Sequence, residues 1–168
     1  MTTQTDSAQA EMASPGKYLT FSLEREVYGI AILKVQEIIG VMPVTKVPRL
    51  PQFMRGVVNL RGKVIPIIDL RLKFGLEAQE NTERTCFIVV QVNRNGVPVT
   101  LGIIVDEVSE VLDIAGNQIE SAPSFASTID TNFLSGMGKV SKTVVMLLDV
   151  DRALAGVGTE DAGMVGDF

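Results

Sequence analysis

The sequence has no histidine and no tryptophan, and its 168 residues include a single cysteine. Without histidine there is no imidazole general base, no histidine-based catalytic triad and no histidine metal ligand. The lone Cys86 excludes an internal disulfide and a cysteine-based zinc site. These absences remove the commonest enzyme active sites. We therefore predict a protein that is not an enzyme and that carries no metal and no cofactor.

A basic stripe and long apolar runs are also missing. The formal net charge is −5, whereas nucleic-acid-binding surfaces are usually basic. No stretch of 18 consecutive apolar residues occurs, and the first residues lack the basic and apolar regions of a signal peptide. We expect no nucleic-acid partner, no direct membrane insertion and a cytoplasmic location.

Apolar residues make up 46% of the chain, but aromatic residues only 5%. Valine, isoleucine and leucine must therefore fill the core, and β-branched side chains suit the pleated faces of a sheet. This composition predicts a mainly β protein. The folded domain is expected over residues 17–154, with flexible tails at 1–16 and 155–168, where polar, small or acidic residues dominate.

A β-hairpin is predicted at the centre of the chain. Residues 57–60 and 64–68 are apolar, β-branched runs, and Arg61-Gly62-Lys63 between them suits a tight turn because glycine tolerates positive φ. An arginine held between two stiff strands is a ready docking group for a carboxylate. The alternative is that Arg61 is simply a solvated turn residue.

Other patterns predict further short elements. We expect a second hairpin around the Asn-Gly pair at 95–96, and a short helix that Asp69 caps. The remaining predicted elements are a hairpin of 17–23 with 27–32, strands at 86–92, 97–105, 133–140 and 143–148, and a turn of helix at 150–154.

The residues after the first hairpin follow helical spacing. Ile32, Val35, Ile38 and Ile39 recur at intervals of three and four, which predicts one or two helical turns with Glu37 on the outside. On such a helix, Val35 is either a core residue or a contact for a partner.

A weak internal repeat is present. Residues 29–38 align with 102–111, 53–56 align with 133–136, and 67–70 align with 147–150. If the repeat is real, the chain holds two similar units of about five short strands, and closing each sheet into a barrel would remove its edges. The alternative is chance similarity among strands rich in valine and isoleucine.

An acidic cluster and a glycine-rich stretch were weighed as binding sites. The cluster of Asp106, Glu107, Glu110 and Asp113 has the spacing of a solvated helical face and lacks calcium-loop spacing, so we interpret it as solvated surface. The stretch 136–141 resembles a phosphate loop, but Val140 stands where the loop needs serine or threonine. Neither feature predicts a ligand site.

Several motifs together resemble the CheW family of bacterial chemotaxis coupling proteins. The most discriminating are Asn59-Leu60-Arg61-Gly62 and the run Leu33-Lys34-Val35-Gln36-Glu37-Ile38, and the likeness extends over residues 17–154 in order and spacing. Further matching stretches are Tyr28-Gly29-Ile30, Pro51-Gln52-Phe53, Pro66-Ile67-Ile68-Asp69-Leu70-Arg71 and Gly102-Ile103-Ile104-Val105-Asp106. The resemblance implies two intertwined five-stranded β-barrels of Src-homology-3-like type with a few short helices.

The same resemblance implies partners and a surface for each. The cytoplasmic tips of chemoreceptors would dock between the barrels beside Val35, Glu37, Gly56 and Arg61. The regulatory domain of the histidine kinase CheA would pack on the other barrel, with Glu120 and Phe125 at a contact that builds rings. Relatives can carry a basic residue at the position of Glu120. The protein would then be cytoplasmic and recruited to membrane-associated receptor arrays.

Three alternatives stay open at this stage. The first is a related coupling module that serves a non-flagellar chemosensory pathway. The second is a barrel-type nucleic-acid-binding protein, which the negative charge and scarce aromatics oppose. The third is an enzyme that uses Asp69 or Asp149, although both are expected to cap helices after strands.

Overall fold

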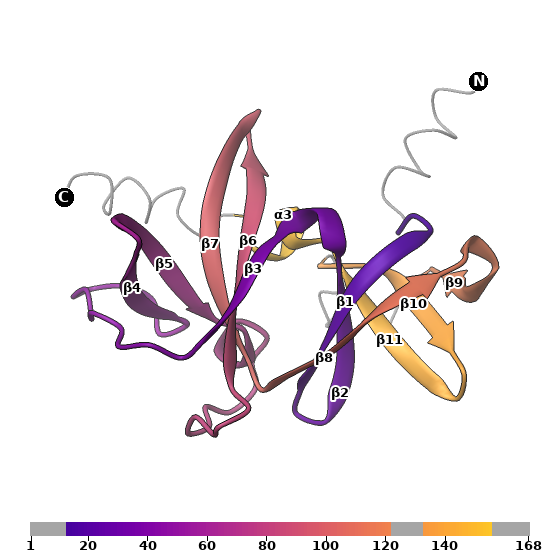
Figure 1. Ribbon diagram of the computed structural model, residues 1–168, viewed down its shortest axis with the longest axis horizontal. Coiled ribbons are helices and arrows are strands. Elements are labelled where there is room, and N and C mark those ends of the chain that lie inside the picture. Colours follow the sequence, from indigo (N-terminus) through magenta and orange to yellow (C-terminus); the bar gives the residue numbers. More distant parts are fainter. Residues whose placement is uncertain (1–12, 122–132, 156–168) are drawn as a thin grey trace.

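The computed structural model describes residues 13–121 and 133–155 and shows two β-sheets with four short helical segments (Figure 1). No helix within these residues has the length and apolar character needed to cross a membrane. The strands are β1 Gly16–Leu23, β2 Glu26–Ala31, β3 Val35–Gly40, β4 Met54–Leu60, β5 Lys63–Asp69, β6 Cys86–Arg94, β7 Val97–Val105, β8 Glu107–Ile114, β9 Ile119–Glu120, β10 Leu134–Val140 and β11 Thr143–Leu148. The helices are α2 Leu70–Lys73 and α3 Val150–Ala153, with 3₁₀ turns η1 Ile32–Lys34 and η2 Gly116–Gln118.

The two sheets are intertwined. The first sheet has the order β8-β1-β2-β11-β10-β9, and the second has the order β3-β6-β7-β5-β4. Each therefore contains strands from both halves of the chain, as the mixed colours of the two sheets in Figure 1 show. In each sheet two ladders join the halves. One is parallel, β2 with β11 and β5 with β7, and the other is antiparallel, β1 with β8 and β3 with β6.

The strand register confirms the internal repeat. In the second sheet Ile67 pairs with Gly102, and in the first sheet Leu147 pairs with Gly29. These are the positions that the repeat aligns, with the two halves exchanged. The repeat is thus a structural relation between halves that swap strands, and the swap ties both halves into one folded unit.

The predicted fold, mainly β with two intertwined sheets and a few short helices, is confirmed, and in the part of the chain that the structure describes strand ladders alone do not close either sheet. The first sheet has a sixth strand, the two-residue β9. Within the described residues, the second sheet keeps β3 and β4 as edges that no ladder joins. In the second sheet, the Arg61–Glu37 ion pair connects the two edges. A backbone bridge between Thr45 and Val57 holds the segment after β3 against β4.

The apolar core forms three layers because the central strands are buried on both faces. Along β6, Ile88 and Val90 face a cluster between the two sheets, whereas Phe87 and Val89 face a smaller cluster on the other side of the second sheet. A third cluster, which includes Ile114, lies on the outer side of the first sheet. Two buried faces explain why these strands are continuous apolar runs instead of alternating ones.

The helix predicted after the first hairpin is wrong. Only the 3₁₀ turn η1 forms, and β3 follows and pairs with β6. Glu37 and Ile39 lie on one half-buried face of β3, and Ile38 between them is exposed. Val35 lies before a β-bulge and packs against the other cluster, between the two sheets. Glu37, expected on the outside, is therefore partly buried, with 31% of its side chain exposed.

The acidic cluster does not lie on a helix either, because β8 is a strand. Glu110 and Asp113 are exposed, as expected of solvated groups. Asp106 differs, because its carboxylate accepts hydrogen bonds from Arg71, at 2.7 Å from the Arg71 Nε atom. Its role is structural, and the spacing alone did not show it.

The predicted turns and caps are confirmed. Asn95 and Gly96 both have positive φ at the β6–β7 turn. The Asp69 side chain caps α2, and Asp149 caps α3 in the same way. These features depend on neighbouring residues only, which is why sequence patterns could find them.

The two tyrosines, Tyr18 and Tyr28, should make the fold sensitive to high pH. Burial raises the pKa of both phenols above the ordinary value of 10.0, and the charges of Glu26 and Glu24 add to this at Tyr28. A raised pKa means that the folded state holds the phenol proton more tightly than the unfolded state. The contribution of the two tyrosines to the free energy of unfolding is therefore fully present below pH 10.0 and is lost as the pH rises through their folded pKa.

Absorbance of tyrosinate and far-ultraviolet circular dichroism, followed together above pH 10.0, should change in one transition. Tyr28→Phe should move the loss of structure to higher pH. Ionisation of both phenols at their ordinary pKa with the sheet intact would contradict this prediction.

Candidate functional site

Arg61 lies at the tip of the β4–β5 hairpin, as predicted. Leu60 pairs with Lys63, so Arg61 and Gly62 are the only loop residues, with φ of 52° and 88°. Positive φ at both positions is the requirement of a type I′ turn, the commonest kind of two-residue hairpin turn together with type II′. The Asn59 side chain accepts a hydrogen bond from the Gly62 backbone N–H at 2.8 Å. The backbone beneath the Arg61 side chain is therefore firmly held.

The Arg61 guanidinium pairs with the carboxylate of Glu37 in the same chain. Arg61 belongs to the β4–β5 hairpin and Glu37 to β3, so the pair spans the two edges of the second sheet. The side chain of Arg61 is 68% exposed and that of Glu37 is 31% exposed. The hydrogen bond and the charge of Glu37 raise the pKa of Arg61. The pair is thus a surface contact that solvent and a partner can reach.

Val35 lies two residues before Glu37 on β3 and is half-buried. It packs against the cluster between the sheets. The pairing of β3 with β6 shifts register between Val35 and Glu37, which marks a β-bulge. Bulges re-aim side chains and are common beside binding sites. The two interpretations of Val35 are therefore compatible, since one side contacts the core and the rest is accessible.

Gly56 has a structural role that the sequence did not reveal. Its φ is 139°, and a Cβ atom there would lie 2.0 Å from the backbone oxygen of Thr45. Thr45 and Val57 form a backbone bridge with two hydrogen bonds of 2.8 and 2.9 Å. Glycine is required here because the connection between β3 and β4 lies directly against β4.

Glu120 lies in β9, on the first sheet. Its carboxylate pairs with Lys139 on β10, and both side chains are more than half exposed. Phe125 lies outside the described residues. Glu120 therefore belongs to a different sheet from Val35, Glu37, Gly56 and Arg61, which lie on the strands and hairpin of the second sheet.

Leu33 is a site candidate that sequence reasoning missed. Its side chain is 94% exposed, and it lies in η1, two residues before Val35. It borders a hollow of about 310 Å³ beside the β6–β7 hairpin. The neighbouring Lys34 is held by Asp151 of α3 at 2.7 Å. The incorrect helix prediction gave no indication that Leu33 is exposed. In the short 3₁₀ turn η1, the Leu33 side chain does not reach the core.

The described residues offer no group of three or more histidine, cysteine, aspartate or glutamate side chains that could hold a metal ion. What they do offer is a surface. The exposed Leu33 and the half-buried Val35 precede Glu37 along η1 and β3, and Glu37 forms an ion pair with Arg61 at the hairpin tip. Apolar contact and an ion pair are therefore available within one short stretch of chain. Such a combination suits the docking of another protein segment.

Comparison with known proteins identifies the family. A model of the CheW-like domain matches residues 17–157. The chain is 43% identical to the chemotaxis protein CheW of Klebsiella aerogenes over 139 residues, which cover 83% of this chain and 81% of the relative. It is 35% identical to the chemotaxis protein CheW of Helicobacter pylori, over 82% of this chain and 81% of the relative.

The fold agrees with a solved structure. The crystal structure of the scaffolding protein TtCheW from Thermoanaerobacter tengcongensis matches with a TM-score of 0.74 and 36% identity, over 84% of this chain and 93% of that one. The chain belongs to the CheW family.

Proposed function

We propose that this protein is a chemotaxis adaptor that couples chemoreceptors to the histidine kinase CheA. It would do so by binding and positioning both partners, with no chemical step of its own. The observation that carries the proposal is the Arg61–Glu37 pair on a two-residue turn, beside the accessible Leu33 and Val35. Membership of the CheW family supports the proposal, because the relatives in sequence are named chemotaxis proteins and the relative of known structure is named a scaffolding protein.

The receptor would dock on the second sheet. A helical receptor tip can lay apolar side chains against Leu33 and Val35 while its polar groups meet the Arg61–Glu37 pair. Because a two-residue turn and a sheet edge hold these groups, little conformational entropy is lost on binding. A rigid contact of this kind can pass a small receptor movement to a kinase held by the same domain.

The kinase would contact the first sheet. Glu120 and Lys139 present an exposed ion pair there, and Phe125 follows Glu120 by five residues in the sequence. An exposed pair of opposite charges contributes to partner choice more than to affinity. We place the regulatory domain of CheA at this surface, with the domain spanning residues 17–154 in the cytoplasm at membrane-associated receptor arrays.

Reversing the charge of Arg61 should test the receptor surface. In Arg61→Glu, two carboxylates face each other at positions 37 and 61, and we expect receptor affinity to fall about tenfold or more, or about 1.4 kcal/mol. The melting temperature should change little because exposed ion pairs contribute little stability. Pull-down and titration of receptor signalling fragments, with CheA binding measured in parallel, would show this.

The double variant Glu37→Arg with Arg61→Glu is the matched control. It restores an ion pair with the direction reversed. Recovery of receptor binding would mean that the pair holds the surface in shape, whereas continued loss would mean that the receptor contacts Arg61 or Glu37 directly. Unchanged receptor binding in Arg61→Glu alone would contradict the assigned surface, and CheA binding would still test the adaptor role separately.

A further inference from the structure

A groove of about 410 Å³ opens at one end of the second sheet, away from the ion pair. Its apolar lining comes mainly from the connection between β3 and β4, with Phe87 of β6 and Ile104 of β7 beneath it. The lining residues of that connection are Val41, Met42, Pro43, Val44 and Lys46. Such a volume accommodates one or two large apolar side chains. Met42 and Val44, which line the groove, pack against the smaller core cluster of the second sheet, and Phe87 beneath them is fully buried.

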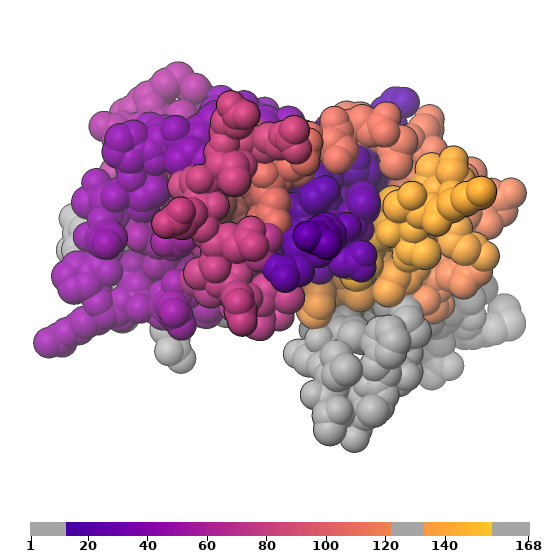
Figure 2. All heavy atoms as spheres, turned by 90° about the horizontal axis from the view of Figure 1, so that it is seen from below, coloured from indigo at the N-terminus to yellow at the C-terminus, as the bar shows by residue number. Residues whose placement is uncertain are grey.

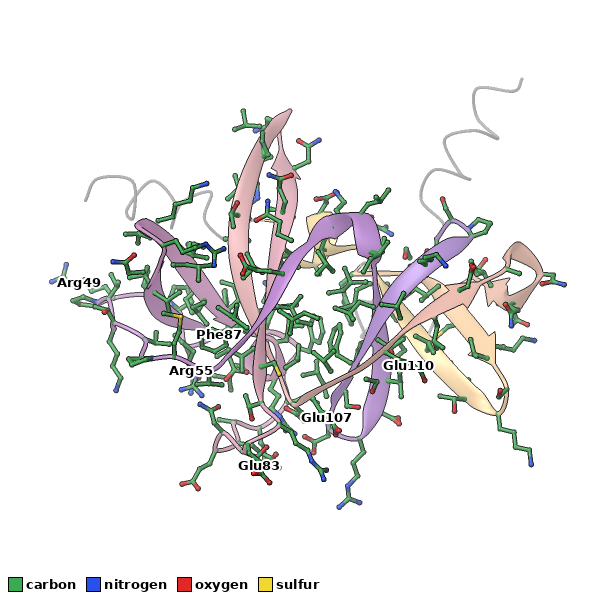
Figure 3. The ribbon with its side chains drawn as sticks, in the orientation of Figure 1. Arg49, Arg55, Glu83, Phe87, Glu107 and Glu110 are labelled. Atoms are coloured by element: carbon green, nitrogen blue, oxygen red, sulfur yellow. The ribbon has the colours of Figure 1, made fainter. Side chains whose placement is uncertain are left out.

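The edge of this groove is positively charged, although the chain carries a net charge of −5. Lys46 and Arg55 line it, and Arg49 lies on the same connection (Figure 3). Arg55 pairs with Asp69 at 3.0 Å, but Lys46 and Arg49 form no ion pair with any residue in 13–121 or 133–155. An occupant with acidic groups and bulky apolar side chains would complement this groove.

The segment 156–168, GVGTEDAGMVGDF, has that chemistry. It contains Glu160, Asp161 and Asp167, no lysine or arginine, and the apolar Met164, Val165 and Phe168. The other stretches outside the described residues fit less well, because both adjoin the first sheet. Ala13, after residues 1–12, bonds to Ser135 of β10, and residues 122–132 lie between β9 and β10.

The segment can reach the groove. The Arg94 guanidinium donates to the carbonyl of Leu154 at 2.7 Å, which places the end of α3 beside the last residue of β6. Phe87 lies seven residues back along the same strand, or roughly 23 Å at the usual rise of a strand. Thirteen residues span up to about 43 Å when extended. Tethering also gives the segment an effective concentration in the millimolar range.

We propose that residues 156–168 bind in the groove between the 41–46 connection and Phe87, as an intramolecular cover. The apolar side chains of Met164, Val165 or Phe168 fill the groove, and the acidic groups face Lys46 and Arg55. This inference does not depend on the adaptor role. Its consequence is that a partner docking at this end of the second sheet must first displace the segment.

Amide chemical shifts of the full chain and of a chain ending at Ala155 test the proposal. We expect differences at the amides of Val41, Met42, Val44 and Lys46. They should be independent of protein concentration and smaller at 1 M salt, where the screening length is about 3 Å. A synthetic peptide of residues 156–168 added to the shorter chain should restore the shifts, with half-saturation at roughly millimolar concentration.

Two full-length variants test whether the charge of Lys46 is needed for binding of the segment. Lys46→Glu should reproduce the spectrum of the shorter chain around the groove. Lys142→Glu, an equal charge change at the exposed β10–β11 turn, should not. Identical groove shifts in the long and short chains would overturn the proposal, as would differences centred on Leu33 and Asn93. Groove shifts that vanish on dilution would also overturn it, because the occupant would then belong to a second copy.

Discussion

Replacing Gly56 with alanine is expected to destabilise the fold by about 3 kcal/mol or more. Backbone at this φ costs a non-glycine residue about 1–3 kcal/mol, and the new Cβ would lie 2.0 Å from the Thr45 backbone oxygen. The contacted atom is backbone and cannot rotate away. The Thr45–Val57 bridge must therefore open, with its two hydrogen bonds at about 1 kcal/mol each.

Gly62→Ala is the matched control. Gly62 also has positive φ, but a Cβ there has no atom within 4 Å. Only the conformational cost applies, about 1 kcal/mol. Urea unfolding of both variants measures the difference in free energy of unfolding. Equal losses in the two would mean that the 41–46 connection moves aside freely, contrary to our expectation.

A destabilised Gly56→Ala variant could lose receptor binding for two different reasons. The family resemblance places Gly56 beside the receptor, whereas the structure shows its hydrogen atom against the 41–46 connection. If Gly56→Ala is poorly folded, its loss of receptor binding is a loss of fold. Receptor titrations of the folded fraction alone would separate the two effects.

The second large effect is expected at Arg71. Its side chain is only 7% exposed and forms ion pairs with two carboxylates, those of Glu24 and Asp106. It donates to both oxygens of Asp106, at the end of β7, and to Glu24 in the β1–β2 turn. Arg71 itself lies in α2, after β5 of the second sheet, so it connects the second sheet to a turn of the first. Figure 2, seen from below, shows the indigo residues of the N-terminal hairpin against magenta-to-pink residues from the middle of the chain.

Arg71→Met should lower the free energy of unfolding by about 3 kcal/mol. Breaking a buried pair by removing one partner costs about 3–5 kcal/mol, and the low end applies because Asp106 and Glu24 remain partly hydrated. The hydrogen bond and charge of Asp106 raise the pKa of Arg71, with a smaller contribution from Glu24. The arginine thus stays charged over the whole range in which the protein folds.

Two controls accompany Arg71→Met. Lys17→Met removes the exposed pair with Asp113, and we expect less than about 0.5 kcal/mol. Adding Asp106→Asn to Arg71→Met should recover part of the loss, because the uncompensated charge is then gone. Thermal and urea unfolding measure all three. A loss at Arg71 no larger than that at Lys17 would show that the apolar cluster alone holds the two sheets together.

The hairpin tips could be predicted from sequence because their conformations are local. Arg61-Gly62 and Asn95-Gly96 adopt the positive φ values that their turns require. The cap of Asp69 on α2 depends on residues within three positions. Val35, Glu37 and Arg61 were also found, through the family motif, although their roles in binding stay predictions.

The error at residues 32–39 has a physical cause. Ile32, Val35, Ile38 and Ile39 fit a helical period, but their β-branched side chains suit a strand equally well. The strand forms instead of the helix because β3 hydrogen-bonds to the edge of β6 that β7 leaves unpaired. The choice placed Glu37 on the half-buried side, where Arg61 reaches it. No local pattern contains that information.

The sequence by itself determined the strand-rich composition, the tight turns, the helix caps and the family, because each depends on neighbouring residues or on a motif read in order. Only the tertiary structure decided which half of the chain each strand joins, that Glu37 is the partner of Arg61, and that Gly56 must lack a side chain. These features arise where segments distant in sequence meet. Which edges and side chains meet there depends on the packing of the whole core.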